Sequence, residues 1–109
     1  MKKDWRLYAH HIIDCINKIR RIQSRGDVTV DDVLYDAVLR NLQTLSEATR
    51  HLPEEKIRQY TVVPWKNISG FRNILVHDYL GEIDSHTILK VIDQHLATLE
   101  TAVMDMLQT

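Results

Sequence analysis

Residues 4–24 of this chain read DWRLYAHHIIDCINKIRRIQS, and the periodicity of this stretch indicates the fold class. Its apolar residues recur at steps of three and four, which places them on one stripe of an α-helix. They are Trp5, Tyr8, Ile12, Cys15, Ile16, Ile19 and Ile22. Gly26 follows as a suitable stop. The stretch therefore predicts a long amphipathic helix with one face to bury.

The same spacing recurs along the rest of the chain. Further helices are predicted over four ranges, namely 32–52, a short piece at 53–60, 64–79 and 84–107. Asp31 and Asp84 are suitable N-caps, and Pro53 and Pro64 suit the start of a helical segment. No strand-like alternation, internal repeat or linker is present in the sequence. The prediction is an all-α, up-and-down bundle of about four main helices plus one short helix.

The composition limits the class of protein. The chain has 109 residues, of which 44% are hydrophobic and 27% are charged, so we expect a single globular domain over residues 1–109. With only 3 Gly and 2 Pro, it is unlike a collagen, a low-complexity chain or a turn-rich all-β protein. The net charge of −1 gives no sign of a globally basic nucleic-acid binder, while a local basic patch stays open.

The expected location is the cytoplasm. Cys15 is the only cysteine, which excludes an internal disulfide framework and a cysteine-rich zinc site and suits a reducing compartment. His10, His11 and Asp14 interrupt the region where a signal peptide would need its apolar segment. No stretch approaches the ~18 uninterrupted apolar residues of a membrane span, so no membrane partner is expected.

The residues that carry chemistry gather near the end of the helix predicted over 64–79. Their spacing is Arg72-x-x-x-x-His77-x-Tyr79. A histidine side chain titrates near neutrality, so His77 is suited to take a proton from a ribose 2′-hydroxyl or return one to a leaving oxygen. Arg72 can hold two phosphate oxygens and stabilise the charge that develops on them. This scheme needs neither a metal ion nor a cofactor. The structural alternative is that Arg72 is a solvated cation, His77 interacts with the helix dipole and Tyr79 is a half-buried aromatic residue.

Helical geometry does not bring these side chains onto one face. Asn73 and His77 are four residues apart and share a face. Around an ideal helix, Arg72 lies about 140° and Tyr79 about 160° from His77. Either the helix unwinds after His77 or a second chain supplies the missing half of the site.

A longer likeness supports the chemical interpretation. The stretches 37–40 (AVLR), 45–48 (LSEA), 63–73 (VPWKNISGFRN) and 77–79 (HDY) closely resemble the HepT branch of the HEPN superfamily. These are small all-helical toxins, also catalogued as the domain of unknown function DUF86. The likeness extends from the first predicted helix through the last. The chain departs from the family pattern at Ser46, where glycine is common.

The resemblance implies a metal-independent endoribonuclease that is the toxin of a type VII HEPN/MNT toxin–antitoxin pair in a prokaryotic cytoplasm. It implies a homodimer with the arginine and histidine of both chains lining one cleft, where RNA such as tRNA or mRNA is cut. The implied second partner is a cognate minimal nucleotidyltransferase antitoxin. That enzyme would silence the toxin by adding AMP units to the motif tyrosine, which blocks the cleft.

Family roles carry over only to matching positions. The resemblance implies that Arg72 binds the scissile phosphate and that His77 is the general acid and base. Tyr79 would be both a cleft residue and the target of AMPylation, and Asn73 would orient the substrate or His77. Glu47 matches the acidic residue of the family's Gly-Glu-Ala stretch and is expected to face the same cleft.

Other polar residues are weaker candidates for a site. His10 and Asp14 are four residues apart and, with His11, give a faint divalent-metal signal, but solvated polar residues are the favoured interpretation. Glu47 and His51 have the same spacing, which favours a contact on the helix surface. His95 falls on an apolar stripe, as core or interface histidines do. A basic surface for RNA is a minority interpretation of Arg20, Arg21 and Arg25, with Lys2, Lys3 and Arg6.

Two other function classes stay open. The chain could be a non-catalytic helical module that binds a nucleotide or a nucleotidyltransferase partner, and a sequence pI near 6.6 favours this slightly over RNA binding. It could also be an inactive homologue kept for dimerisation, against which the intact Arg72, Asn73, His77 and Tyr79 argue.

Overall fold

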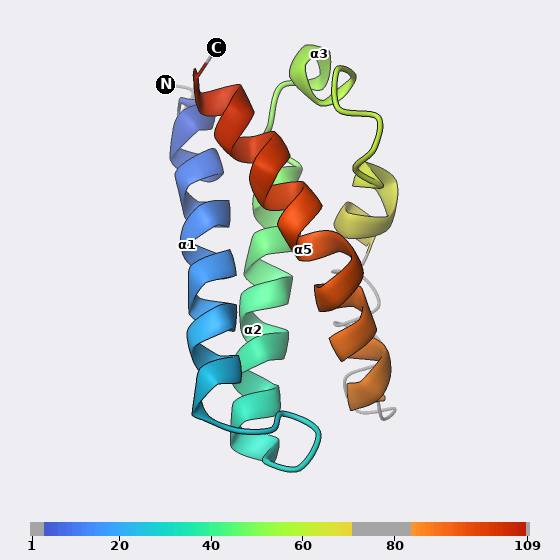
Figure 1. Ribbon diagram of the computed structural model, residues 1–109. Coiled ribbons are helices and arrows are strands. Elements are labelled where there is room, and N and C mark those ends of the chain that lie inside the picture. The colour runs from blue at the N-terminus through green and yellow to red at the C-terminus, as the bar shows by residue number, and fades with distance from the viewer. Residues whose placement is uncertain (1–3, 71–83, 109) are drawn as a thin grey trace.

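The computed structural model describes residues 4–70 and 84–108, and this part of the chain is helical, without strands (Figure 1). Its helices are α1 (Trp5–Arg25), α2 (Asp32–Thr49), the short α3 (Glu54–Ile57) and α5 (Ser85–Gln108). Residues 65–70 are also helical. The predicted all-α fold class is confirmed. The remainder of the helix predicted over 64–79 lies outside the described residues.

Aspartates begin the three long helices. The Asp4 carboxylate accepts a hydrogen bond from the Arg6 backbone N–H at 3.0 Å, and this bond lowers the pKa of Asp4 below its ordinary value. Asp31 accepts from the backbone N–H groups of Val33 and Leu34, and Asp84 accepts from the backbone of His86. Each carboxylate satisfies amides that the first turn of a helix leaves without partners. The N-caps predicted at Asp31 and Asp84 are therefore confirmed.

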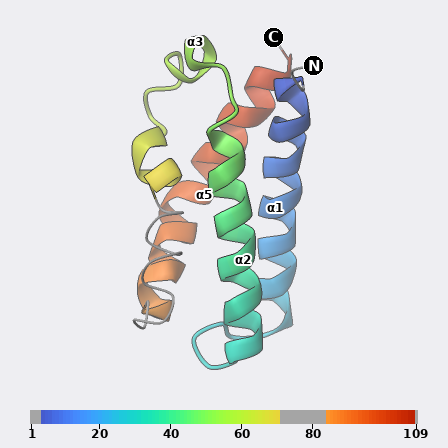
Figure 2. The same ribbon diagram turned by 180° about the vertical axis from the view of Figure 1, so that it is seen from behind.

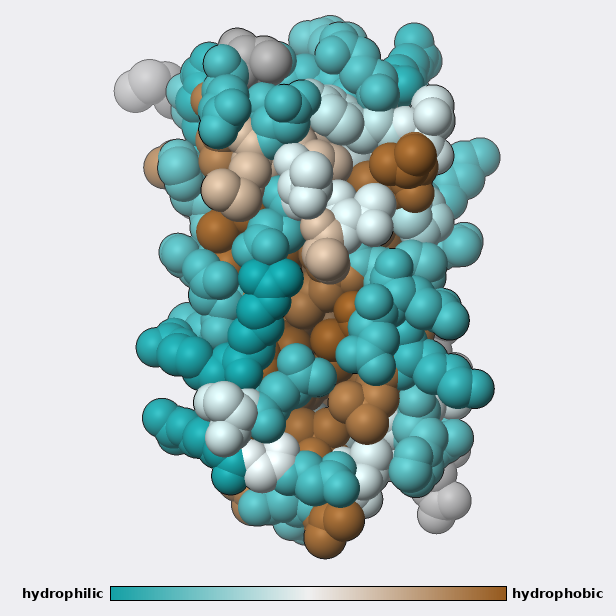
Figure 3. All heavy atoms as spheres, in the orientation of Figure 1, coloured by the Kyte–Doolittle hydropathy of each residue, from teal (hydrophilic) through white to brown (hydrophobic). Residues whose placement is uncertain are grey.

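The long helices run up and down along one bundle. In Figure 1, α1 descends, α2 ascends beside it, and α5 ascends across both of them. Figure 2 shows α1 and α2 side by side from behind. Their apolar stripes meet in one core, which includes the fully buried Ile12, Ile16, Val38, Ile88 and Val103. A strip of hydrophobic atoms runs down the middle of the face in Figure 3, with hydrophilic residues on both sides.

Residues 60–65, which follow α3, are fixed to the bundle by polar contacts. The Tyr60 hydroxyl donates a short hydrogen bond to the Asp105 carboxylate near the end of α5, and this bond raises the pKa of Tyr60. The Trp65 indole N–H donates to the Tyr60 carbonyl at 3.0 Å. Trp65 also packs against the core. These contacts set the position from which residues 65–70 run back along the bundle.

Within the described residues, no helix is both long enough and apolar enough to cross a membrane.

Candidate functional site

The predicted catalytic motif lies outside the described residues. Arg72, Asn73, His77 and Tyr79 all fall between residues 71 and 83, so their predicted roles stay predictions. Of the predicted site residues, Glu47 alone is described. It lies on α2, and the pockets around α2 are therefore the surroundings that the structure gives for a site.

A polar pocket lies between α1 and α2 and has a cavity volume of about 420 Å³. Helix α1 contributes residues from its first two turns, and α2 contributes residues from Arg40 onward, with His51 just after its end. The lining residues are Tyr8, His11, Arg40, Gln43, Thr44, Glu47, Ala48 and His51. Glu47 is therefore part of a polar concavity rather than of the apolar core.

Two contacts involve residues that line this polar pocket. The rings of Tyr8 and His51 stack with their centroids 4.2 Å apart and their planes 13° from parallel, which joins the start of α1 to the end of α2. The Glu47 carboxylate lies 3.8 Å from the Arg50 guanidinium, and about half of each side chain is exposed to solvent. An exposed pair at this distance contributes little to stability. The two residues thus have partners besides each other, and the predicted Glu47–His51 surface contact stays a prediction.

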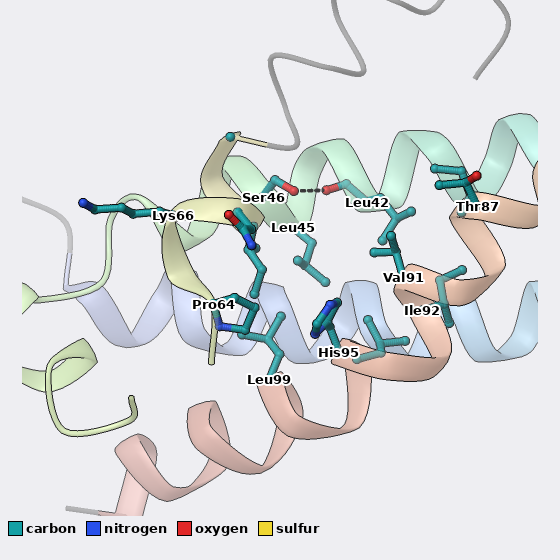
Figure 4. Close-up of a pocket in the computed structure, with 15 residues that line it drawn as sticks. Leu42, Leu45, Ser46, Pro64, Lys66, Thr87, Val91, Ile92, His95 and Leu99 are labelled. Carbon is teal, nitrogen blue, oxygen red and sulfur yellow. Dashed lines mark hydrogen bonds between the residues drawn. The ribbon is translucent and has the colours of Figure 1, made fainter. Parts of the chain in front are cut away.

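A second, apolar cavity of about 500 Å³ lies between α2, residues 64–70 and α5 (Figure 4). His95 points into it among leucine and isoleucine side chains, including Leu45 and Leu99. The Ser46 hydroxyl donates to the Leu42 carbonyl at 2.7 Å, so this buried polar group is satisfied by its own helix. His95 is half-buried, as the prediction of a core or interface histidine requires.

The neighbouring residues Ser46 and Glu47 line two different cavities. Ser46 lines the apolar cavity with Gly70, the last described residue before the motif, whereas Glu47 lines the polar pocket. Neighbouring residues of a helix point about 100° apart, so this division follows from the helix itself. The expectation that Glu47 faces the same cleft as Arg72 is not tested, because Arg72 lies outside the described residues.

A third pocket joins the end of α2 to the segment that leads into the motif. Its cavity volume is about 340 Å³, and its lining includes Thr49, Arg50, Trp65, Lys66 and Ser69. Arg50 therefore lies beside this pocket while its guanidinium also approaches Glu47. Two cationic residues, Arg50 and Lys66, therefore line this pocket.

Two of the basic residues named as weaker candidates have structural partners. Arg20 donates two hydrogen bonds to Glu100 on α5, at 2.9 and 2.7 Å, and Arg6 pairs with Asp4. Because their charges are paired, Arg6 and Arg20 are weaker candidates for a basic RNA-binding surface. Among residues 4–70 and 84–108, no group of three or more His, Cys, Asp or Glu side chains is placed to hold a metal ion. Cys15 is buried on α1, and burial raises the pKa of its thiol.

Sequence reasoning did not assemble the polar pocket. The sequence pattern places Tyr8 on the apolar stripe, gives His11 only a faint metal signal, and includes Arg40 only in the family likeness. One signal was available, because polar residues recur at steps of three or four beside the apolar stripe of α2. They are Arg40, Gln43, Thr44, Glu47 and His51.

Comparison with known proteins identifies the family. The family described as Ribonuclease HepT-like matches residues 12–106. A protein of Caldanaerobacter subterraneus subsp. tengcongensis named a "putative RNase" is 36% identical over 94% of each chain. A "putative RNase" of Methanocaldococcus jannaschii is 32% identical over 95% of this chain and 91% of its own.

A more distant relative bears the family's own name. A "probable ribonuclease HepT" of Thermococcus cleftensis is 26% identical over 92% of this chain and 93% of its own. No solved structure matches this chain. The resemblance noted in residues 37–79 is thus confirmed along nearly the whole length, and the chain belongs to the ribonuclease HepT-like family.

Proposed function

We propose that this protein is an endoribonuclease toxin that cuts RNA without a metal ion. The observation that carries the proposal is the family match over residues 12–106, because that range contains the complete Arg72-x4-His77-x-Tyr79 motif. The names of the relatives, which describe RNases, support the same substrate class.

The proposed reaction is an attack of a ribose 2′-hydroxyl on the adjacent phosphate. His77 removes the 2′ proton, the 2′ oxygen forms a bond to phosphorus, and the bond from phosphorus to the 5′ oxygen breaks. Arg72 stabilises the negative charge on the phosphate oxygens, and Asn73 orients the substrate. The leaving 5′ oxygen takes a proton from a protonated His77. The products are a 2′,3′-cyclic phosphate end and a 5′-hydroxyl end.

We assign the active form to a homodimer in the prokaryotic cytoplasm, whose toxicity is controlled by a minimal nucleotidyltransferase antitoxin. In AMPylation, the Tyr79 phenolic oxygen forms a bond to the α-phosphorus of ATP, and pyrophosphate leaves while the phenol loses its proton. The added phosphate would pair with Arg72 and occupy its anion site. The adenosine would fill the space through which RNA enters.

The test is RNA cleavage by the purified chain in EDTA beside an identically purified His77→Ala variant. We expect cleavage by the parent alone, with cyclic phosphate ends, because a contaminating nuclease would appear in both preparations. Intact mass is measured on the same samples, so that a chain already carrying AMP is recognised and excluded. Equal cleavage by both proteins, or none by an unmodified parent, would contradict the proposal.

A second candidate function is a binding module without catalysis. The near-neutral pI of 6.6 favours it, because RNA binding gains from counterion release at a basic surface. Such a module would bind a nucleotide or its transferase partner, and the His77→Ala variant would behave like the parent.

A further inference from the structure

The polar pocket between α1 and α2 has features of a ligand site that the motif chemistry does not use. Its volume of about 420 Å³ falls in the range of small-ligand pockets. It combines an arginine, a glutamate, a tyrosine ring, two histidine rings and an amide within one concavity. Because metal-holding groups of three or more side chains are missing from the described residues, these groups suit an organic ligand better than a cation.

Arg40 supplies a positive charge that is available to a ligand. It is exposed and lines the pocket, and it makes no ion pair with any carboxylate of the described residues. Arg6, Arg20, Arg50 and Arg58 each have such a carboxylate. The pocket's own carboxylate, on Glu47, lies beside Arg50 instead. Arg40 can therefore hold a phosphate without giving up a partner that the structure shows.

The Tyr8–His51 stack supplies a flat surface beside this charge. Tyr8 covers one face of the His51 ring at a centroid distance of 4.2 Å. His51 is nevertheless exposed and lines the pocket. Because the two rings already support each other, a planar base can extend the stack without ordering a loose side chain.

The side chains between the cation and the rings suit a base edge. Gln43 is exposed, lines the pocket and makes no hydrogen bond to another described residue, so its amide can both donate and accept. Thr44 donates its hydroxyl hydrogen to the Arg40 carbonyl at 2.9 Å, which leaves its oxygen as an acceptor. His11, on α1, adds its two ring nitrogen atoms to those of His51.

We propose that this pocket binds one nucleotide unit of a single-stranded RNA, with the phosphate at Arg40 and the base stacked on His51. The inference rests on the proposed function, since it takes RNA as the substrate. It assigns the strand a holding site on α1 and α2, outside the Arg72–Tyr79 motif. Arg40 and His51 would thereby anchor the substrate without belonging to the motif.

The test separates binding from cleavage. The probe is a fluorescein-labelled single-stranded DNA of about 12 nucleotides, which lacks the 2′-hydroxyl and stays intact, and binding is followed by anisotropy at several KCl concentrations. Arg40→Gln should weaken binding several-fold and reduce the slope of log Kd against log salt by about 0.7, the value for one phosphate on a single strand. His51→Ala should weaken binding while the slope is kept.

Arg58→Gln is the matched control, because it removes the same charge from an exposed arginine outside the pocket. It should bind like the parent. Circular dichroism of every variant identifies any that fails to fold. In RNA cleavage, Arg40→Gln should raise KM and leave kcat unchanged, which is the pattern of an anchoring residue.

The outcomes distinguish the two proposals. If the parent cuts no RNA but Arg40→Gln and His51→Ala still lose binding, the catalytic proposal fails and the pocket assignment stands. If the parent cuts RNA and both variants bind and cut like the parent, the pocket assignment is overturned. It is also overturned if the parent does not bind the DNA, or if AMP displaces the strand at an equal nucleotide concentration, which would indicate a mononucleotide site.

Discussion

At the scale of single residues, Ile12 shows how one position commits the chain to its core. Its side chain is fully buried, whereas Leu7, five residues earlier on the same helix, is 60% exposed. Both are large aliphatic residues, so the difference in burial decides how much each contributes to the stability of the fold. Burial removes apolar surface from water and fills space that no neighbour can fill.

We expect Ile12→Ala to lower the free energy of unfolding by about 2–5 kcal/mol, because it removes buried methyl groups and leaves a cavity. The control Leu7→Ala should change it by less than about 0.5 kcal/mol, as exposed positions do. Urea unfolding followed by circular dichroism measures both. Equal losses for the two variants would contradict the assignment of Ile12 to the core.

Cys15 carries a prediction about pH. Burial raises the pKa of its thiol above the ordinary value of 9.0, so the folded protein favours the protonated form. The stabilisation is complete below pH 9.0 and is lost as the pH rises from 9.0 through the folded pKa, because the unfolded chain releases its proton first.

The folded thiol should therefore react slowly with a disulfide reagent at pH 8 and quickly in denaturing urea. In Cys15→Ala, the fall in the free energy of unfolding above pH 9.0 should be smaller than in the parent. Rapid labelling of the native protein would show that the thiol is accessible and would remove the basis of this expectation.

At the scale of elements, the ends of helices follow from local chemistry. The N-caps at Asp31 and Asp84 could be predicted, because a carboxylate before an apolar run satisfies free amides whatever the rest of the chain does. The end of α2 was predicted at Leu52 and lies at Thr49 instead. Beyond it the backbone N–H groups of Arg50 and His51 bond three residues back, at 3.2 and 3.1 Å, so the last turn tightens.

The Asp31 cap is testable against its neighbour. Asp31→Ala should cost about 1 kcal/mol, because the N–H groups of Val33 and Leu34 lose their acceptor. Asp32→Ala removes the same charge from the first turn but no capping hydrogen bond, and it should cost about half as much or less. Thermal unfolding at low and moderate salt compares them. A strong salt dependence for Asp31→Ala alone would indicate a charge effect instead of a cap.

At the scale of the whole molecule, sequence reasoning reaches less far. The stripes of Ile12, Ile16 and Ile88 identify a core because periodicity depends on one helix at a time. The polar pocket depends on which flanks of α1 and α2 meet, and this is set by how the two helices cross. No spacing within either helix predicts that Tyr8 reaches His51 from another element. Family likeness supplied Glu47 as a candidate but not its surroundings.

The arrangement of the motif between two chains can be tested with mixed dimers. On an ideal helix Arg72 and His77 point about 140° apart, so one chain cannot present both to a single phosphate without unwinding. If each site takes its arginine from one chain and its histidine from the other, a dimer of one Arg72→Ala chain and one His77→Ala chain keeps one complete site. Each variant alone keeps none.

We therefore expect the two inactive variants to recover RNA cleavage when they are unfolded together and refolded as a mixture. Random pairing would place about half of the dimers in the mixed, twofold-related form, each with one working site, so about a quarter of the parental activity should return. A mixture of separately folded samples, assayed before exchange, is the control. If the refolded mixture stays inactive while its mixed dimers are isolated by two different tags, both residues must act within one chain, and unwinding after His77 becomes the required geometry.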